Sequence, residues 1–94
     1  MPPKFDWNIG NIMKSEIKHS ISAFEAESVF SDPKMVVFFD PKHSKTEYRY
    51  ICLGESNQKR IVFVAFTFRG VDVVRVISVR LANKKEKQVY ESYR

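Results

Sequence analysis

Three residues with ionisable side chains, His43, Glu47 and Arg49, follow one another at short spacing in the segment DPKHSKTEYRY. If residues 47 to 53 form a strand, Glu47 and Arg49 lie two positions apart and point to the same face. A carboxylate can accept or donate a proton while a neighbouring guanidinium binds the negative charge of a substrate. Imidazoles change protonation near neutral pH. The segment therefore offers acid–base chemistry on an anionic substrate. An ordinary ion pair with a turn histidine nearby is the alternative.

Two arginines in the later segment RVISVR, Arg75 and Arg80, form a second group of candidate residues. Arg75 interrupts an apolar run, and a buried guanidinium without a partner is costly, so Arg75 must be paired or face a cleft. Guanidinium groups suit phosphate because their planar forks bond two oxygens at once and stay charged. A salt bridge from Arg75 to Glu47 is the alternative, and both interpretations can hold together.

Two helices are expected before the strands that carry these residues. Apolar residues at helical spacing predict the first helix near residues 8 to 19. Ser22 and Glu25 have the S-x-x-E spacing of a capping box, in which both side chains bond backbone N–H groups at a helix start. A second helix should begin there and stop before Pro33, because the residue before a proline resists helical geometry. Its core side would consist of Ala26, Val29 and Phe30.

From residue 35 onward, β-branched and aromatic runs predict four strands, at about 35 to 39, 47 to 53, 60 to 68 and 72 to 81. Gly70 favours a tight turn after Arg69, and residues 54 to 59 form another connection. In the last strand, strict alternation places Arg75 and Val79 on one face and Arg80 on the other, unless a bulge intervenes. Asn83 and Glu86 repeat the capping pattern and open a last helix.

These elements predict an α+β fold with two N-terminal helices, a four-stranded, mainly antiparallel sheet and a C-terminal helix. The 94 residues, 44% of them hydrophobic, suit one domain spanning 1–94. The single Cys52 cannot form an internal disulfide, and no Cys/His spacing resembles a zinc site, so we expect a cytoplasmic protein without metal or cofactor. The longest uncharged apolar runs, 35 to 39 and 61 to 68, are far shorter than the ~20 residues of a membrane span. The net charge of +5 favours polyanions or an acidic protein as partners.

Five short motifs occur in a fixed order along the chain: FDWN at 5 to 8, KHSIS at 18 to 22, HSKTEYR at 43 to 49, GES at 54 to 56 and RVISVR at 75 to 80. With these motifs in this order, the chain resembles the BrnT toxin family over nearly its whole length. The family motifs have glycine at the position of Ser20 and alanine at that of Val79. Both departures fall at helix-joining and packing positions rather than among the candidate residues.

The resemblance implies a RelE-like compact fold and an endoribonuclease that blocks translation when free. It implies neutralisation by a BrnA-type antitoxin, in a heterotetramer of two toxins and two antitoxins. It also implies autoregulation in which operator DNA is contacted only through the antitoxin.

RNA cleavage without a metal needs a base for the 2′-hydroxyl proton, cations for the charge on the phosphorane, and an acid for the departing 5′-oxygen. The sequence shows no Asp/Glu cluster suited to two metal ions, which favours this route. The predicted catalytic residues are therefore His43, Glu47, Arg49, Arg75 and Arg80.

Three further cations are candidate RNA contacts. Arg69 lies at the predicted hairpin tip, and Lys84 and Lys85 fall in the first turn of the last helix, where the helix dipole disfavours positive charge. Ordinary solvated residues are the alternative at all three positions. For the whole chain, the alternative function is a non-catalytic RNA-binding or antitoxin-binding module acting in transcriptional autoregulation.

Overall fold

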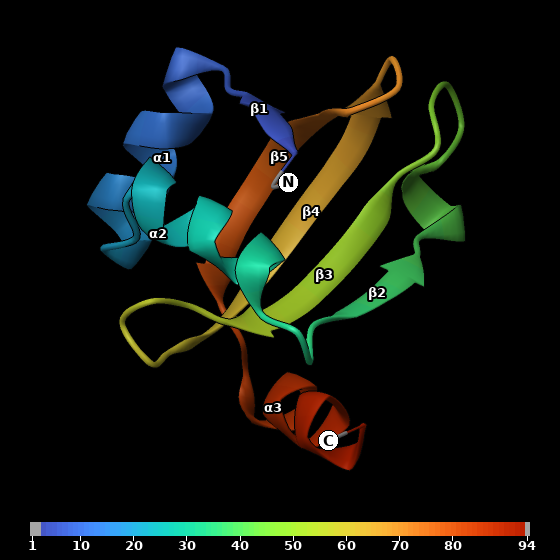
Figure 1. The fold of residues 1–94 in the computed structure, drawn as a ribbon. Coiled ribbons are helices and arrows are strands. Elements are labelled where there is room, and N and C mark those ends of the chain that lie inside the picture. Colours follow the sequence, from blue (N-terminus) through green and yellow to red (C-terminus); the bar gives the residue numbers. More distant parts are fainter. Residues whose placement is uncertain (1–2, 94) are drawn as a thin grey trace.

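The sheet is mixed, with one parallel and three antiparallel pairings between neighbouring strands. The computed structural model describes residues 3–93, and within them five strands run in the order β1-β5-β4-β3-β2 (Figure 1). The strands are β1 (Lys4–Asp6), β2 (Val36–Phe39), β3 (Tyr50–Glu55), β4 (Ile61–Arg69) and β5 (Val73–Leu81). The predicted α+β class is confirmed, but the predicted count of four strands is wrong. The strand β1 is too short to show alternation, and only the distant β5 makes it a strand.

The helices follow the predicted order. They are α1 (Ile9–His19), α2 (Ala23–Ser28), continued by the 3-10 turn η1 (Val29–Ser31), then the 3-10 turn η2 (Pro41–His43) and α3 (Lys84–Ser92). The capping box of α3 is complete, because Asn83 and Glu86 each bond the other's backbone N–H. At α2 only half of the predicted box forms: the Ser22 hydroxyl accepts the Glu25 N–H, whereas the Glu25 carboxylate binds Arg60 and Ser56.

A β-bulge interrupts the pairing of β4 with β5. Ala65 of β4 pairs with Ser78, but the next residue, Phe66, pairs with Val76. One step along β4 therefore corresponds to two steps along β5, and Ile77 is the extra residue. A bulge of this kind reverses the alternation of faces in the residues that follow it.

The bulge decides which β5 side chains enter the core. Val74, Val76 and Val79 are all at least 96% buried and belong to the same hydrophobic cluster. Arg75 and Arg80 consequently share the opposite face of the sheet. Strict alternation had placed Arg75 with Val79, and the extra residue corrects that expectation.

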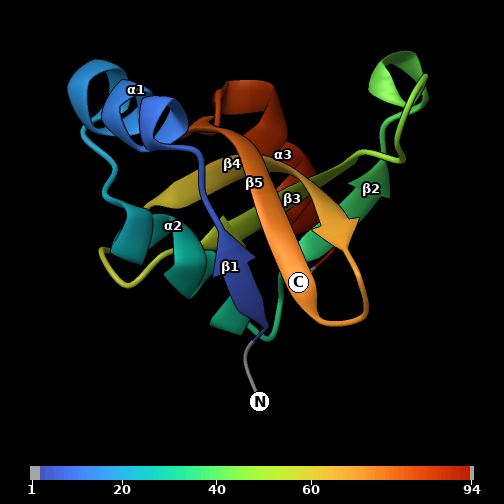
Figure 2. The same ribbon diagram turned by 90° about the horizontal axis from the view of Figure 1, so that it is seen from above.

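The two faces of the sheet are covered differently. Figure 2 shows α2 and α3 on opposite sides of the sheet. The α2 side holds the main core, in which Ala26 and Val29 are buried as predicted and Cys52 is fully enclosed. On the α3 side, Tyr90 packs with Leu53 in a smaller cluster. No helix among residues 3–93 is long and apolar enough to cross a membrane.

Gly54 is needed where η1 crosses β3. It was expected in a connection but lies inside β3, which begins at Tyr50 rather than at residue 47. A Cβ atom at Gly54 would lie 2.7 Å from Cγ1 and 3.2 Å from the carbonyl oxygen of Val29. Because Val29 is fully buried, η1 could not move away from such a Cβ atom without disturbing the core.

We expect Gly54→Ala to lower the free energy of unfolding by about 1–3 kcal/mol, the usual cost of overpacking a filled site. Denaturant-induced unfolding measures this change. Ser78→Ala, at an exposed position of β5, is the control and should shift stability by less than about 0.5 kcal/mol. Equal effects of the two substitutions would contradict the close approach of η1 to β3.

Glu25 forms a buried ion pair that ties α2 to the turn after β3. The Arg60 guanidinium donates from Nε to Glu25 Oε2 over 2.9 Å and from Nη2 to Oε1, while the Ser56 hydroxyl donates over 2.7 Å. The Glu25 side chain is only 5% exposed. Hydrogen bonding from Arg60 lowers the pKa of Glu25, despite the opposing effect of burial.

The lowered pKa makes the contribution of Glu25 depend on pH. A depressed carboxyl pKa stabilises the fold above the unfolded-state value near 4.5, and this stabilisation is lost as pH falls through the folded-state pKa. We expect Glu25→Gln to cost about 2–3 kcal/mol at pH 7 and progressively less below pH ~4.5. Unfolding measured across pH tests this, with the exposed Glu16→Gln as control. A pH-independent loss would contradict the ion pair as its cause.

Candidate active site

The carboxylate of Glu47 lies between two arginines on the α3 side of the sheet. Its Oε1 is 3.5 Å from Arg49 Nη2 and its Oε2 is 4.0 Å from Arg75 Nη1. The three side chains are between 34% and 43% exposed, so all are within reach of solvent. The structure therefore brings together three of the five predicted catalytic residues. The strand expected from residue 47 begins only at Tyr50, so Glu47 and Arg49 share no strand face, but they form an ion pair, and the salt bridge considered for Arg75 is present.

Strand pairing brings Arg75 and Arg49 to the same place. Arg75 of β5 pairs with Thr67 of the neighbouring strand β4. The Thr67 hydroxyl donates to the carbonyl oxygen of Tyr48, in the segment that precedes β3. This bond holds the residues that precede β3 against β4. Arg49 extends the β2–β3 ladder by one bond, accepting the Asp40 N–H at 2.8 Å. Arg49 Nε is buried and has no hydrogen-bond partner among residues 3–93.

His43 is held by Asp40 in the connection that leads to Glu47. The Nδ1 atom of His43 lies 2.8 Å from Oδ2 of Asp40, whose side chain is 17% exposed, whereas that of His43 is 66% exposed. A carboxylate on Nδ1 favours the tautomer in which Nε2 is free to accept a proton. Ser44 links this pair to the arginine cluster, because its hydroxyl donates to the Asp40 carbonyl and accepts the Arg49 N–H.

Arg80 stands apart from the cluster although it shares its face. The β4 partners of Arg80 and Arg75 are Phe63 and Thr67, four residues apart, which corresponds to roughly 13 Å at ~3.3 Å per residue. Both Arg80 Nη atoms donate to Glu86 at 2.8 Å, and the guanidinium carbon lies 3.8 Å from the centre of the Phe63 ring. Hydrogen bonding from Arg80 lowers the pKa of Glu86. The structure thus gives Arg80 a fixed partner at the start of α3.

The predicted RNA contacts lie at two different ends of the sheet. Arg69, at the end of β4, is 60% exposed and forms a 3.0 Å ion pair with Asp6. Lys84 and Lys85 are exposed in the first turn of α3. Figure 1 shows the β4–β5 turn and the β2–β3 connection at one end of the sheet and α3 at the other. Arg69 is therefore at the end that holds Glu47, whereas the two lysines are not.

Two open hollows meet at Glu47 and Tyr48. One is formed with Ser44, Lys45 and Thr46, and the other with Tyr50, Thr67 and Phe68. Glu47 lines both hollows and is paired with Arg49 and Arg75, although neither arginine lines either hollow. Cys52 does not contribute a nucleophile, because burial raises the pKa of its thiol to about 12.

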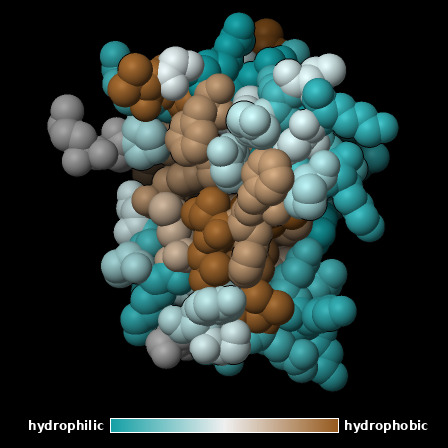
Figure 3. All heavy atoms as spheres, turned by 90° about the vertical axis from the view of Figure 1, so that its right-hand side faces the viewer, coloured by the Kyte–Doolittle hydropathy of each residue, from teal (hydrophilic) through white to brown (hydrophobic). Residues whose placement is uncertain are grey.

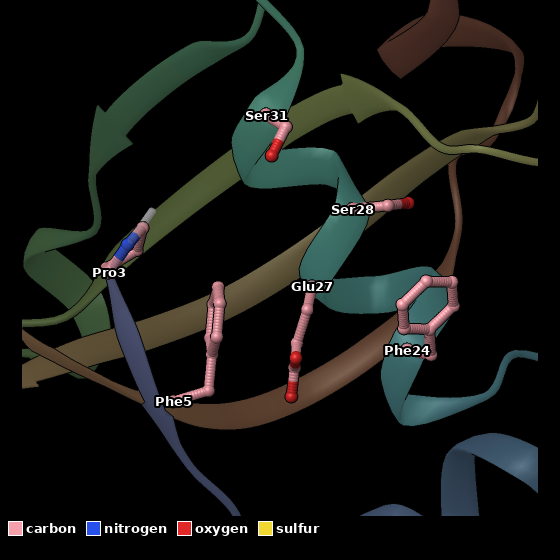
Figure 4. A pocket seen from close by; sticks show the side chains of 6 residues that line it. All are labelled: Pro3, Phe5, Phe24, Glu27, Ser28 and Ser31. Carbon is pink, nitrogen blue, oxygen red and sulfur yellow. The ribbon is translucent and has the colours of Figure 1, made fainter. Parts of the chain in front are cut away.

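Another hollow, shown in Figure 4, lies on the α2 side of the sheet. Glu27 stands there between the rings of Phe5 and Phe24. The indole Nε1 of Trp7 donates to Glu27 Oε2 over 2.9 Å. None of the described residues that line this hollow is a cation, and Glu27 is an acid, so its charge does not favour a phosphate.

Sequence reasoning missed Asp40, Ser44 and Thr67. The only signal for Asp40 was an acid three residues before a histidine, with a proline that starts a turn between them. Ser44 and Thr67 act through hydrogen bonds to backbone atoms of residues 40, 48 and 49, and the sequence gives no sign of such contacts.

The chain is similar to known proteins in sequence and in fold. The chain is similar to the crystal structure of the Brucella abortus ribonuclease toxin BrnT, with 25% sequence identity and a TM-score of 0.62, over 87% of this chain and 99% of that one. No curated protein sequence matches the chain. Residues 7–86 match the family described as ribonuclease toxin, BrnT, of type II toxin–antitoxin system. The chain therefore belongs to the BrnT family of ribonuclease toxins.

Proposed function

We propose that this protein is a metal-independent endoribonuclease toxin whose active site comprises the cluster of Glu47, Arg49 and Arg75 together with His43, from the connection that leads to Glu47. The observation that carries the proposal is the position of the Glu47 carboxylate between two partly exposed arginines. Family membership supplies RNA as the substrate class. Among residues 3–93, no three His, Cys, Asp or Glu side chains gather as a group that could hold a metal ion.

The proposed reaction is attack of the ribose 2′-oxygen on the adjacent phosphorus, with cleavage of the bond from phosphorus to the 5′-oxygen. The products are a 2′,3′-cyclic phosphate and a 5′-hydroxyl end. The two arginines bind the phosphate oxygens and stabilise the extra negative charge of the phosphorane. Glu47 and His43 share the two proton transfers, one removing the 2′-hydroxyl proton and the other supplying a proton to the 5′-oxygen.

Arg80, Lys84 and Lys85 take other roles in this proposal. Arg80 orders the start of α3 through Glu86, and the two lysines hold more distant phosphates of the same RNA. The partner of a type II toxin is a protein antitoxin, and we propose that it neutralises this chain in a complex of two toxins and two antitoxins. Released from it, the chain would block translation by cleaving RNA.

We expect Arg75→Ala to reduce the rate of RNA cleavage by about 100-fold or more, because the developing phosphorane charge loses a cation. Cleavage of a single-stranded RNA by purified, antitoxin-free protein measures the effect. Lys14→Ala, on the exposed side of α1, removes the same charge elsewhere and should change the rate less than twofold. If Arg75→Ala and Arg49→Ala both cleave normally, the active site lies elsewhere. A folded wild-type protein that cleaves no RNA would favour the non-catalytic binding module.

A double-mutant cycle tests whether Asp40 acts through His43. We expect His43→Ala to slow cleavage by about 100-fold and Asp40→Asn by about 10-fold. The double variant should be no slower than His43→Ala alone, because residues that act as a unit give non-additive effects. Losses that multiply in the double variant would show that Asp40 does not serve His43.

A further inference from the structure

The α2 side of the sheet leaves a group of apolar side chains uncovered. Val37 and Phe39 of β2 are 45% and 49% exposed, and Tyr48 and Phe68 are 69% and 53% exposed. The ring of Phe39 contacts that of Tyr48, with centroids 5.8 Å apart. Figure 3, which views the side of the molecule that is on the right in Figure 1, shows a stripe of hydrophobic side chains bordered by hydrophilic ones. We refer to these four residues as the apolar patch.

The patch continues into a groove. Val37 and Phe68 line a hollow of about 200 Å³, together with Phe30, Met35 and Phe66. Its lining is almost wholly apolar, unlike that of the hollows beside Glu47. Soluble proteins rarely expose apolar surface of this kind unless a partner covers it. The groove is therefore suited to bulky apolar side chains from another molecule.

The position of the patch favours a protein over RNA. Phe68 pairs with Val74 and Val37 with Cys52, and both partners are core residues of the α2 side. The patch therefore lies on the opposite face from Arg49 and Arg75. An RNA strand held by those arginines would have its bases displayed on their side of the sheet. A groove lined by aliphatic as well as aromatic side chains also offers little flat surface for base stacking.

Charge indicates an acidic partner. The chain carries a net charge of +5, which attracts acidic proteins at long range. Lys4, in the edge strand β1, and Lys45, next to the hollow at Tyr48, are exposed and have no ion pair among residues 3–93. Carboxylates on either side of an apolar anchor could pair with these lysines.

The patch reaches the candidate active site at one end. Tyr48 and Phe68 line the same hollow as Glu47 and Thr67. A polypeptide that covers Tyr48 would therefore also cover the approach to Glu47. Binding on the apolar face would in this way stop a reaction that takes place on the other face.

We propose that the apolar patch and its groove bind an amphipathic, acidic segment of the antitoxin, which inserts apolar side chains between Val37 and Phe68 and blocks access to Glu47. This inference rests on the proposed function, since it requires a toxin that a protein must neutralise. It goes beyond that function by naming the surface that the antitoxin occupies.

The test compares two matched substitutions. Val37→Glu places a carboxylate in the patch, and Ile17→Glu places one on α1, where Ile17 is 76% exposed and outside the patch. The probe is the purified cognate antitoxin of this chain. We expect its Kd to rise at least 10-fold with Val37→Glu and less than twofold with Ile17→Glu. RNA cleavage by the free variants should equal that of the wild type, and only Val37→Glu should escape inhibition.

Each outcome separates the inference from the proposed function. If both variants bind antitoxin like the wild type, the patch is not its docking site, whether or not RNA is cleaved. If Val37→Glu instead weakens binding of an RNA oligonucleotide and leaves antitoxin binding unchanged, the patch serves RNA and the inference is overturned. If the wild type cleaves no RNA but Val37→Glu still loses antitoxin, the docking surface stands and the enzymatic proposal fails.

Amide hydrogen exchange on the unmodified complex provides a second test that needs no variant. We expect antitoxin binding to slow exchange in β2 and in residues 66–69, and to leave α1 unchanged. Protection confined to α1, or confined to α3, would overturn the proposal even if a variant failed to fold.

Discussion

The extra residue in β5 decides what each face of the sheet can do. Without the bulge at Ile77, alternation would carry Val79 to the side of Arg75 and send Arg80 into the main core. A buried guanidinium there would need an acidic partner, and the buried residues around it are apolar. Because of the bulge, the β5 side chains on the α2 side are all apolar, and both arginines lie on the other side. The core and the candidate site therefore depend on the same local irregularity.

On the α3 side of the sheet, one end packs against α3 and the other end carries the candidate active site. At one end, Tyr90 packs with Leu53, and its hydroxyl donates to Asp32 over 2.6 Å. Although burial tends to raise the pKa of Asp32, this bond and one from the Glu55 N–H outweigh burial and lower it. At the other end no helix among residues 3–93 covers the sheet, and Glu47 and its arginines are partly exposed to solvent. The same face therefore packs against α3 at one end and leaves the other end accessible to a polyanion.

The geometry of the ion pairs separates structural arginines from available ones. Arg80 donates two hydrogen bonds of 2.8 Å to Glu86, and Arg60 donates two hydrogen bonds to the buried Glu25. Such bidentate pairs fix both partners in place. Arg49 and Arg75 approach Glu47 only to 3.5 and 4.0 Å, distances that leave their N–H groups free to take another acceptor. The loosely held arginines are the ones that a phosphate could recruit.

The sequence alone determined the helices, most strand positions and the family, because periodicity, capping residues and ordered motifs are local properties of the chain. It also paired Glu47 with Arg49, but on the premise that both lie in a strand, whereas both precede β3 and meet in the connection before it. It could not reveal β1, the bulge at Ile77 or the bond between Asp40 and His43. Those features arise from pairing between distant strands and from the path of a connection. Only the tertiary structure could separate Arg75, which meets Glu47, from Arg80, which meets Glu86, because identical side chains five residues apart differ only in the neighbours that the fold brings to them.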